Sequence, residues 1–179
     1  QSGNLIPVSI NVGALYLEQD NFINHLEVIL KANPEIGKNE IQLEILESSA
    51  LNDISQISKV IEKCNQLGIS FALDDFGTGY SSLNYLKRLA ATTLKIDQSF
   101  VKDMLIAPDD LEIIKAIIGL AQAFNRDIVA EGVETNEHAE KLIQMGCEIG
   151  QGYVFAKPMP ADKLLNWKAS WKPLYNSGI

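Results

Sequence analysis

Hydrophobic residues along the chain alternate between short continuous runs and helical spacing. The runs are mostly β-branched or apolar and predict strands over residues 8–12, 41–46, 70–75, 93–97, 127–131 and 148–155. Nearly continuous hydrophobicity is typical of parallel strands that are covered on both faces. Between the runs, apolar residues recur every three or four positions, which predicts helices over residues 21–31, 54–67, 111–124 and 139–145.

Glycines and capping residues mark the ends of these helices. Gly68 and Gly146 directly follow two of them, where a glycine commonly terminates a helix. The pair Asn52-Asp53 and the residue Thr135 are candidate N-caps. The alternation therefore consists of about six βα units within one domain that spans residues 1–179.

Two architectures accommodate six such units. One is an open doubly wound sheet, and the other is most of a (β/α)₈ barrel, which normally needs about 250 residues. Right-handed crossovers are expected in both. The first strand-to-helix turn lacks the glycine motif of dinucleotide-binding folds, and no Walker A loop is present. Periodicity alone leaves the two architectures open.

Polar side chains follow the apolar part of each predicted strand. In chain order they are Asn11, Glu44 with Glu47 just beyond, Asp74 and Asp75, Lys95 and Asp97, Glu131 with Glu134, and Gln151. Because the carboxyl ends of parallel strands share one rim, we expect these side chains to converge around one mouth. A single acid at a strand end is usually a cap or a solvated residue. Recurrence at six consecutive strand ends favours a shared site.

Carboxylates that converge in this way repel one another, and partial burial makes their charged forms more costly. Either some of them stay protonated or a cation offsets their charge. Oxygen ligands favour Mg²⁺, Mn²⁺ or Ca²⁺ over zinc. Asp74 and Asp75 could both turn to one site where the pleat of the strand breaks, and one could bridge two ions. Two divalent ions about 3.5–4 Å apart are a common device for in-line attack on a phosphodiester.

The composition is that of a globular domain with an acidic surplus. Apolar residues make up 46% and charged residues 21% of the chain, and the net charge is −8. A broad nucleic-acid or anionic-membrane surface is therefore not expected. The two cysteines, Cys64 and Cys147, belong to no CxxC motif. We expect buried, reduced thiols in a cytoplasmic domain.

Four stretches of the sequence make the chain resemble a known family. They are residues 74–83 (DDFGTGYSSL), residues 95–97 (KID), residues 130–135 (AEGVET), and Gln151-Gly152-Tyr153 with Pro158. Their order and spacing resemble those of the EAL domain of bacterial cyclic di-GMP phosphodiesterases, over essentially the whole chain. The resemblance implies a TIM-like (β/α) barrel, incomplete here. It also implies hydrolysis of cyclic di-GMP to linear pGpG with two Mg²⁺ or Mn²⁺ ions.

The resemblance also implies a role for each residue at the strand ends. The implied metal ligands are Asn11, Glu44, Asp74, Asp75 and Glu131, with Asp74 shared by both ions. The implied catalytic residues are Lys95, which would hold the attacking water, together with Glu131 and Gln151. The residues implied to support the substrate or the loop after Asp75 are Glu47, Asp97, Glu134 and Pro158. That loop couples dimerisation to metal binding in the family, so a homodimer is expected.

Three departures from the family pattern bear on activity. The Glu-Ala-Leu motif, whose glutamate is a metal ligand in the family's opening strand, is absent, so we expect the first one or two βα units to be lacking. Leu46 and Gly13 stand where threonine and serine are usual. The leading hypothesis is a cyclic di-GMP phosphodiesterase of bacterial second-messenger signalling, acting in the cytoplasm without DNA or direct membrane contact. The alternative is an inactive cyclic di-GMP receptor or dimerisation scaffold.

Overall fold

A single parallel sheet forms the centre of the computed structural model, which describes residues 6–50, 54–79 and 83–172. Its strands are β1 (Val8–Asn11), β2 (Ile41–Leu46), β3 (Ser70–Phe76), β4 (Thr93–Ile96), β5 (Asp127–Ala130) and β6 (Ile149–Gly150). Each strand pairs in parallel with the next along the chain, so the order in the sheet is β1-β2-β3-β4-β5-β6. The first five strands lie where the hydrophobic runs predict them, to within a residue or two at each end.

Helices connect the strands and extend beyond the last one. They are α1 (Ala14–Leu17), α2 (Phe22–Ala32), α3 (Glu47–Ala50), α4 (Ile54–Gln66), α5 (Leu83–Arg88), α6 (Gln98–Asp103), α7 (Pro108–Ala123), α8 (Asn136–Gln144) and α9 (Ala161–Ser170). The four helices predicted from periodicity correspond to α2, α4, α7 and α8. Helices α1, α3, α5 and α6 have four to six residues each, which is too short for a periodic signal.

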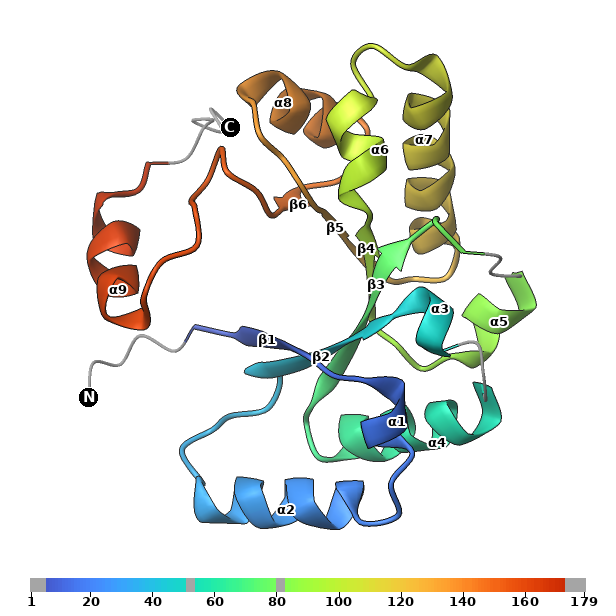
Figure 1. Cartoon of the computed structure of the whole chain (residues 1–179), viewed down its shortest axis with the longest axis vertical. Helices are drawn as coiled ribbons and strands as arrows, with labels where there is room; N and C mark the ends of the chain where they lie inside the picture. Colours follow the sequence, from blue (N-terminus) through green and yellow to red (C-terminus); the bar gives the residue numbers. More distant parts are fainter. Residues whose placement is uncertain (1–5, 51–53, 80–82, 173–179) are drawn as a thin grey trace.

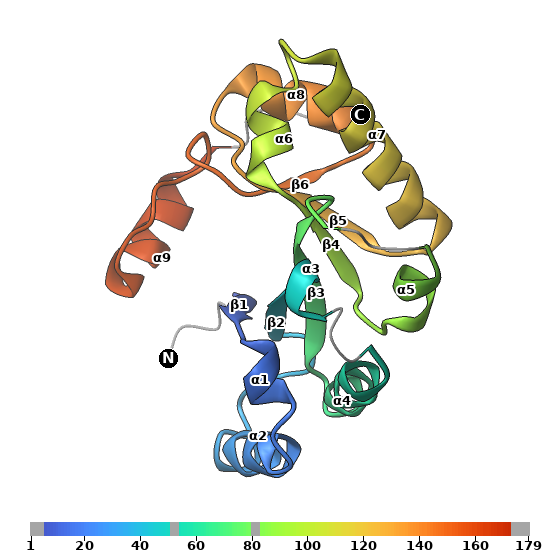
Figure 2. The same ribbon diagram turned by 45° about the vertical axis from the view of Figure 1, so that its right-hand side comes forward.

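The sheet is curled, and the larger helices follow one another around its outer side (Figures 1 and 2). Helix α9 stands apart from them, across from the strands. A doubly wound sheet would reverse its strand order at a switch point, whereas this order runs from β1 to β6 without reversal. The open doubly wound alternative is therefore wrong, and the fold is a curled half-barrel.

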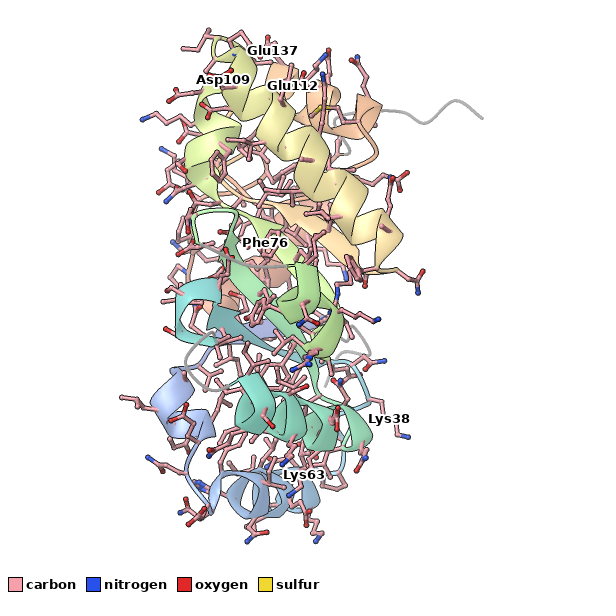
Figure 3. All side chains as sticks on the ribbon, turned by 90° about the vertical axis from the view of Figure 1, so that its right-hand side faces the viewer. Lys38, Lys63, Phe76, Asp109, Glu112 and Glu137 are labelled. Carbon is pink, nitrogen blue, oxygen red and sulfur yellow. The ribbon has the colours of Figure 1, made fainter. Side chains whose placement is uncertain are left out.

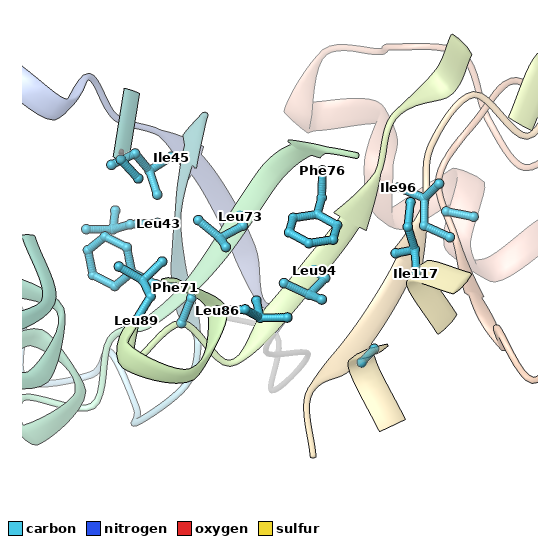
Figure 4. Close-up of a cluster of buried hydrophobic side chains, with 14 of the residues drawn as sticks. Leu43, Ile45, Phe71, Leu73, Phe76, Leu86, Leu89, Leu94, Ile96 and Ile117 are labelled. Carbon is cyan, nitrogen blue, oxygen red and sulfur yellow. The ribbon is translucent and has the colours of Figure 1, made fainter. Parts of the chain in front are cut away.

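The outer face of the sheet carries the hydrophobic core. Leu43, Phe71, Leu73, Leu94 and Ile96 alternate along β2, β3 and β4 and are buried beneath the helices (Figure 4). Removing a side chain of this size from water stabilises the fold by about 1.5–3 kcal/mol. Because successive residues of a strand point to opposite faces, the residues between them point to the inner face. That alternation sends the polar strand residues to the inside of the half-barrel.

Charged side chains lie on the outer side of the molecule, on helices and on a loop (Figure 3). Asp109, Glu112 and Glu137 are near one end of the molecule, Lys38 and Lys63 are near the other, and Phe76 lies between them. No helix in the described part of the chain is long and apolar enough to cross a bilayer.

The last predicted strand is wrong for most of its length, because β6 contains only Ile149 and Gly150. Pairing continues to Gln151, which donates to Ala130 and accepts from the amide of Val133. Gly152 then lies directly against the backbone of Val133, and the amide of Val154 bonds the Val133 carbonyl. The chain therefore turns at Gly152, and its apolar residues after that point pack as part of a loop.

The predicted helix ends agree with the observed ones where the structure describes them. Gly68 and Gly146 adopt φ angles of 86° and 91°, the left-handed region that a glycine after a helix supplies. The side chain of Thr135 accepts a hydrogen bond from the amide of His138 and caps α8. The other predicted N-cap, Asn52-Asp53, lies outside the described residues.

Both cysteines are free and buried, and burial raises the pKa of Cys64 to about 12 and that of Cys147 to about 11. At about pH 8 both thiols are therefore protonated and inaccessible, and the thiolate is the reactive form. We expect a thiol reagent such as DTNB to modify the native protein slowly and both cysteines promptly in urea. Rapid modification of either cysteine in the native protein would contradict their placement.

Candidate metal centre

Four neighbouring strands bring charged side chains together at their carboxyl ends, on the inner face. The ammonium Nζ of Lys95 lies 2.8 Å from Glu44 Oε2, 2.8 Å from Asp74 Oδ1 and 2.7 Å from Glu131 Oε1. Lys95 is only 4% exposed. Strands β2, β3 and β4 and the residue that directly follows β5 thus each contribute one member of a buried charge cluster. We call Glu44, Asp74, Lys95 and Glu131 the rim cluster.

A backbone irregularity turns two consecutive aspartates toward this cluster. The pairing of β3 with β4 shifts register between Leu73 and Phe76, and Asp75 has a φ of 55°. A bulge of this kind re-aims a side chain that regular alternation would send to the opposite face. Carboxylate oxygens of Asp74, Asp75 and Glu131 consequently lie within 4.8 Å of one another.

Asp75 and Asp97 form a hydrogen-bonded pair of acids at this site. Burial, a hydrogen bond with Asp97 and repulsion from Asp74 raise the pKa of Asp75 above its ordinary value. Burial acts in the same direction on Asp97, but hydrogen bonds from the hydroxyl and amide of Ser99 outweigh it and lower the pKa of Asp97. Asp97 is the N-cap of α6. The cap therefore holds a carboxylate beside Asp75 in its charged form.

The electrostatics of the rim cluster favour a cation. Burial raises the pKa of Glu131 even though Lys95 donates a hydrogen bond to it. Burial opposes the charge on Lys95, but hydrogen bonds from Lys95 to Asp74, Glu131 and Glu44 raise its pKa above the ordinary value. One ammonium thus faces three carboxylates, with Asp75 as a fourth acid nearby.

The donor set fits a divalent metal ion. Asp74, Asp75 and Glu131 supply only oxygen atoms, which suit Mg²⁺ or Mn²⁺ better than zinc. Their spacing allows one ion to contact all three residues. A divalent charge would also relieve the repulsion that raises the pKa of Asp75.

Asn11 and Gln151 occupy the two outer positions of the same rim. Asn11 pairs with Glu44 in the register of β1 with β2, and its residue is exposed. Gln151 directly follows β6 and lines a polar cavity of about 290 Å³ together with Glu131, Glu134 and Gln98. The structure therefore brings the predicted residues of all six strand ends to one edge of the sheet.

Two further predicted residues, Glu47 and Pro158, have different surroundings. Glu47, which is 1% exposed, accepts a hydrogen bond from the amide of Gly77 at 2.9 Å, in the loop after Asp75. Pro158 lines a cavity of about 350 Å³ together with Gln151, Tyr153 and Trp167. Glu47 is thus attached to the loop that the resemblance assigns to it, whereas Glu134 lines the cavity beside Gln151.

Comparison with known proteins agrees with this architecture. The sequence model described as "EAL domain" matches residues 1–158. The bifunctional diguanylate cyclase/cyclic di-GMP phosphodiesterase MucR of Pseudomonas aeruginosa is 38% identical over 158 residues, which cover 88% of this chain and 23% of MucR. The chain belongs to the EAL domain family.

Solved EAL structures superpose closely on this one. The EAL domain of Mycobacterium smegmatis DcpA matches with a TM-score of 0.86 and 38% identity, covering 94% of this chain and 75% of that one. The PaMucR phosphodiesterase in complex with c-di-GMP matches with a TM-score of 0.83 and 37% identity, covering 88% and 64%. The TIM-like fold implied by the sequence motifs is therefore confirmed. The chain spans about a quarter of the length of the curated relatives it matches.

One polar residue beside the rim cluster, Gln98, is not among the site residues that the sequence predicted. Gln98 begins α6 directly after Asp97, and it lines the polar cavity with Glu131 and Gln151. Its place immediately after a strand end was the available signal. A polar residue at the start of a short helix is, however, most often a simple surface residue.

The turn after Gln151 depends on the absence of a side chain at Gly152. A Cβ atom there would collide with the carbonyl oxygen and the nitrogen of Val133. We expect Gly152→Ala to lower the free energy of unfolding by about 1–3 kcal/mol or more, because backbone atoms must move. Chemical denaturation measures this loss.

Gly119 of the same domain provides the matched control. It lies within α7, and a Cβ atom there would meet nothing within 4 Å. Gly119→Ala should raise the free energy of unfolding by about 0.5–1 kcal/mol, since alanine favours a helix interior over glycine. Equal effects of the two substitutions would contradict the close contact at Gly152.

Proposed function

We propose that the protein carrying this EAL domain hydrolyses cyclic di-GMP to linear pGpG with the help of two Mg²⁺ or Mn²⁺ ions. The observation that carries the proposal is the grouping of the Asp74, Asp75 and Glu131 carboxylates beside the buried ammonium of Lys95. The relatives support the choice of substrate, because MucR is named a cyclic di-GMP phosphodiesterase and its structure is a c-di-GMP complex.

Asp74, Asp75 and Glu131 would hold the ions, with Asp74 shared between them and with Glu44 and Asn11 completing the rim. When bound, the ions would supply an activated water at neutral pH and offset the charge of the phosphodiester. The cluster contains more carboxylates than ammonium groups, so without ions it would repel an anionic substrate. The charge of the bound ions would offset that repulsion.

Lys95 serves the reaction as a fixed positive charge. Its pKa lies above the ordinary value, so the ammonium stays protonated throughout the neutral range. In the proposed reaction it orients the attacking water and stabilises the negative charge that develops on the phosphoryl oxygens. Its burial strengthens that interaction, because the effective dielectric is lower than in water.

The chemical step adds one water molecule to one phosphodiester. A bond forms between the water oxygen and phosphorus, and the bond from phosphorus to the 3′-oxygen of the neighbouring ribose breaks. The proton lost by the water balances the one taken up by the leaving 3′-oxygen. Gln151 and Glu134 line the polar cavity beside Glu131 and would orient the water and the sugar-phosphate there.

The proposed setting is a cytoplasmic homodimer. A second-messenger nucleotide is read inside the cell, and the net charge of −8 suits a small phosphate ligand held locally better than DNA or an anionic membrane. The Gly77 loop, attached to Glu47, would connect the dimer contact with the ion ligands.

The test is conversion of cyclic di-GMP by the full-length protein, followed by chromatography of the products with Mg²⁺, with Mn²⁺ and with EDTA. We expect pGpG with either ion and none with EDTA. Absence of turnover at every ion concentration would overturn the proposal. Calorimetric binding of cyclic di-GMP without turnover would instead favour the receptor hypothesis.

A further inference from the structure

A second row of polar side chains lies on the inner face, one step nearer the amino ends of the strands than the rim cluster. Residues two apart on a strand share a face, so Gln42 lies next to Glu44 on β2 and Thr93 lies next to Lys95 on β4. Gln42 donates from Nε2 to the Thr93 hydroxyl at 3.0 Å, and that nitrogen also lies 3.4 Å from Ser70 Oγ.

This hydrogen bond and the Glu44–Lys95 ion pair have the same geometry in the sheet. Each joins β2 to β4 and crosses β3, and each connects residues that are 51 positions apart. Each also runs diagonally, because the register pairs Glu44 with Ala72 and Ala72 with Thr93. The neutral bond and the charged bond are therefore two parallel links between the same strands.

Ala72 is the residue of β3 over which both links pass. It is fully buried, although it lies on the inner face and outside the hydrophobic core cluster. Because the register pairs Ala72 with both Glu44 and Thr93, one end of each link lies beside it. We expect a branched side chain at this position to crowd both links.

The hydrogen bond between Gln42 and Thr93 bears on the geometry of the ion pair between Glu44 and Lys95. Glu44, Asp74 and Glu131 converge on one ammonium and repel each other, so their separation depends on what holds the strands beneath them. A hydrogen bond between an amide and a hydroxyl carries no net charge and survives changes at the rim. Groups outside the ligand shell of a metal site orient its ligands, and here Gln42 and Thr93 would do so through the spacing of the strands and not through a bond to a ligand.

We propose that Gln42 and Thr93 are positioning residues for the metal centre and that Ala72 is the spacer that lets them meet. Their hydrogen bond holds β2 and β4 at the separation that places Glu44 and Lys95 beside Asp74. The inference rests on the proposed function only in assuming that these acids bind divalent ions.

The first test compares Thr93→Val with Thr93→Ser by calorimetric titration of the metal-free protein with Mn²⁺. Valine keeps the shape and removes the hydroxyl, whereas serine keeps the hydroxyl. We expect about 10-fold weaker Mn²⁺ binding for valine, the lower end of the range for outer partners of a metal site, and near wild-type binding for serine. Equal affinities of the two variants for Mn²⁺ would overturn the proposal.

Ser58→Ala is the matched control for lost stability. Ser58 is 8% exposed and donates to the carbonyl of Arg88 at 2.8 Å, between two helices outside the sheet. The substitution Ser58→Ala removes a buried hydroxyl, as Thr93→Val does, and should leave the affinity for Mn²⁺ unchanged.

The second test replaces the spacer residue. Ala72→Val should weaken Mn²⁺ binding, and its control Ala121→Val, at a buried site in α7, should not.

A crystal structure of Thr93→Val gives a readout that needs neither metal nor turnover. We expect the Lys95 Nζ to Glu44 Oε2 distance to lengthen beyond hydrogen-bonding range from 2.8 Å. An unchanged rim cluster in that variant would overturn the proposal. If the wild-type protein fails to hydrolyse cyclic di-GMP, the proposed function fails, but this distance still decides the positioning role of Thr93.

Discussion

Replacing Lys95 with methionine is expected to reduce cyclic di-GMP hydrolysis by roughly 100- to 1,000-fold, the usual cost of removing one preorganised donor from a reacting centre. The ammonium is 4% exposed and touches three carboxylates. Methionine preserves the length of the side chain but removes the charge that orients water and stabilises the phosphoryl oxygens. Initial rates at saturating Mn²⁺ measure the loss.

Lys115→Met is the control for this substitution. Lys115 lies on α7, where it is half exposed and pairs with Glu112 at 2.6 Å. Its loss should leave the rate unchanged, because an exposed ion pair contributes little. A Lys95→Met protein that retains a third of the wild-type rate would exclude the proposed role of Lys95.

Asp74→Asn is expected to abolish tight binding of Mn²⁺ and, with it, turnover. Asp74 belongs to the carboxylate group within 4.8 Å and also accepts from Lys95 at 2.8 Å. The amide keeps an oxygen for Lys95 but loses the negative charge that the ions need. The Mn²⁺ affinity should fall by more than the roughly 10- to 100-fold that outer partners contribute. Calorimetric titration measures this loss.

Asp127→Asn provides the comparison for Asp74. Asp127 begins β5, so it lies at the opposite end of the sheet from the rim, and it is exposed. Each of the two substitutions removes one negative charge from a strand of the parallel sheet. An equal loss of Mn²⁺ affinity in both variants would show that net charge, and not the rim, governs binding.

The sequence predicted the strand ends well because each strand carries its own signal. Apolar residues mark β2 and β4, and Glu44 and Lys95 stand between them on strands that are otherwise largely apolar. The recurrence of acids therefore predicted the rim before any fold was known. The choice between a barrel and a doubly wound sheet depended on strand order, which periodicity does not encode.

The features that the sequence did not reveal depend on contacts between distant segments. The turn at Gly152 depends on its contact with Val133, and the apolar residues that follow imitate a strand. The bulge that turns Asp75 toward Asp74 depends on pairing with β4. The link between Gln42 and Thr93 crosses an intervening strand, so neither residue stands out in its local sequence.

The most direct test of the metal centre is anomalous diffraction at the manganese absorption edge from crystals of the protein soaked in millimolar Mn²⁺. We expect a manganese peak in contact with the carboxylates of Asp74, Asp75 and Glu131. Manganese found only on exposed acids such as Asp109 or Glu112, or no peak at the strand ends, would contradict it.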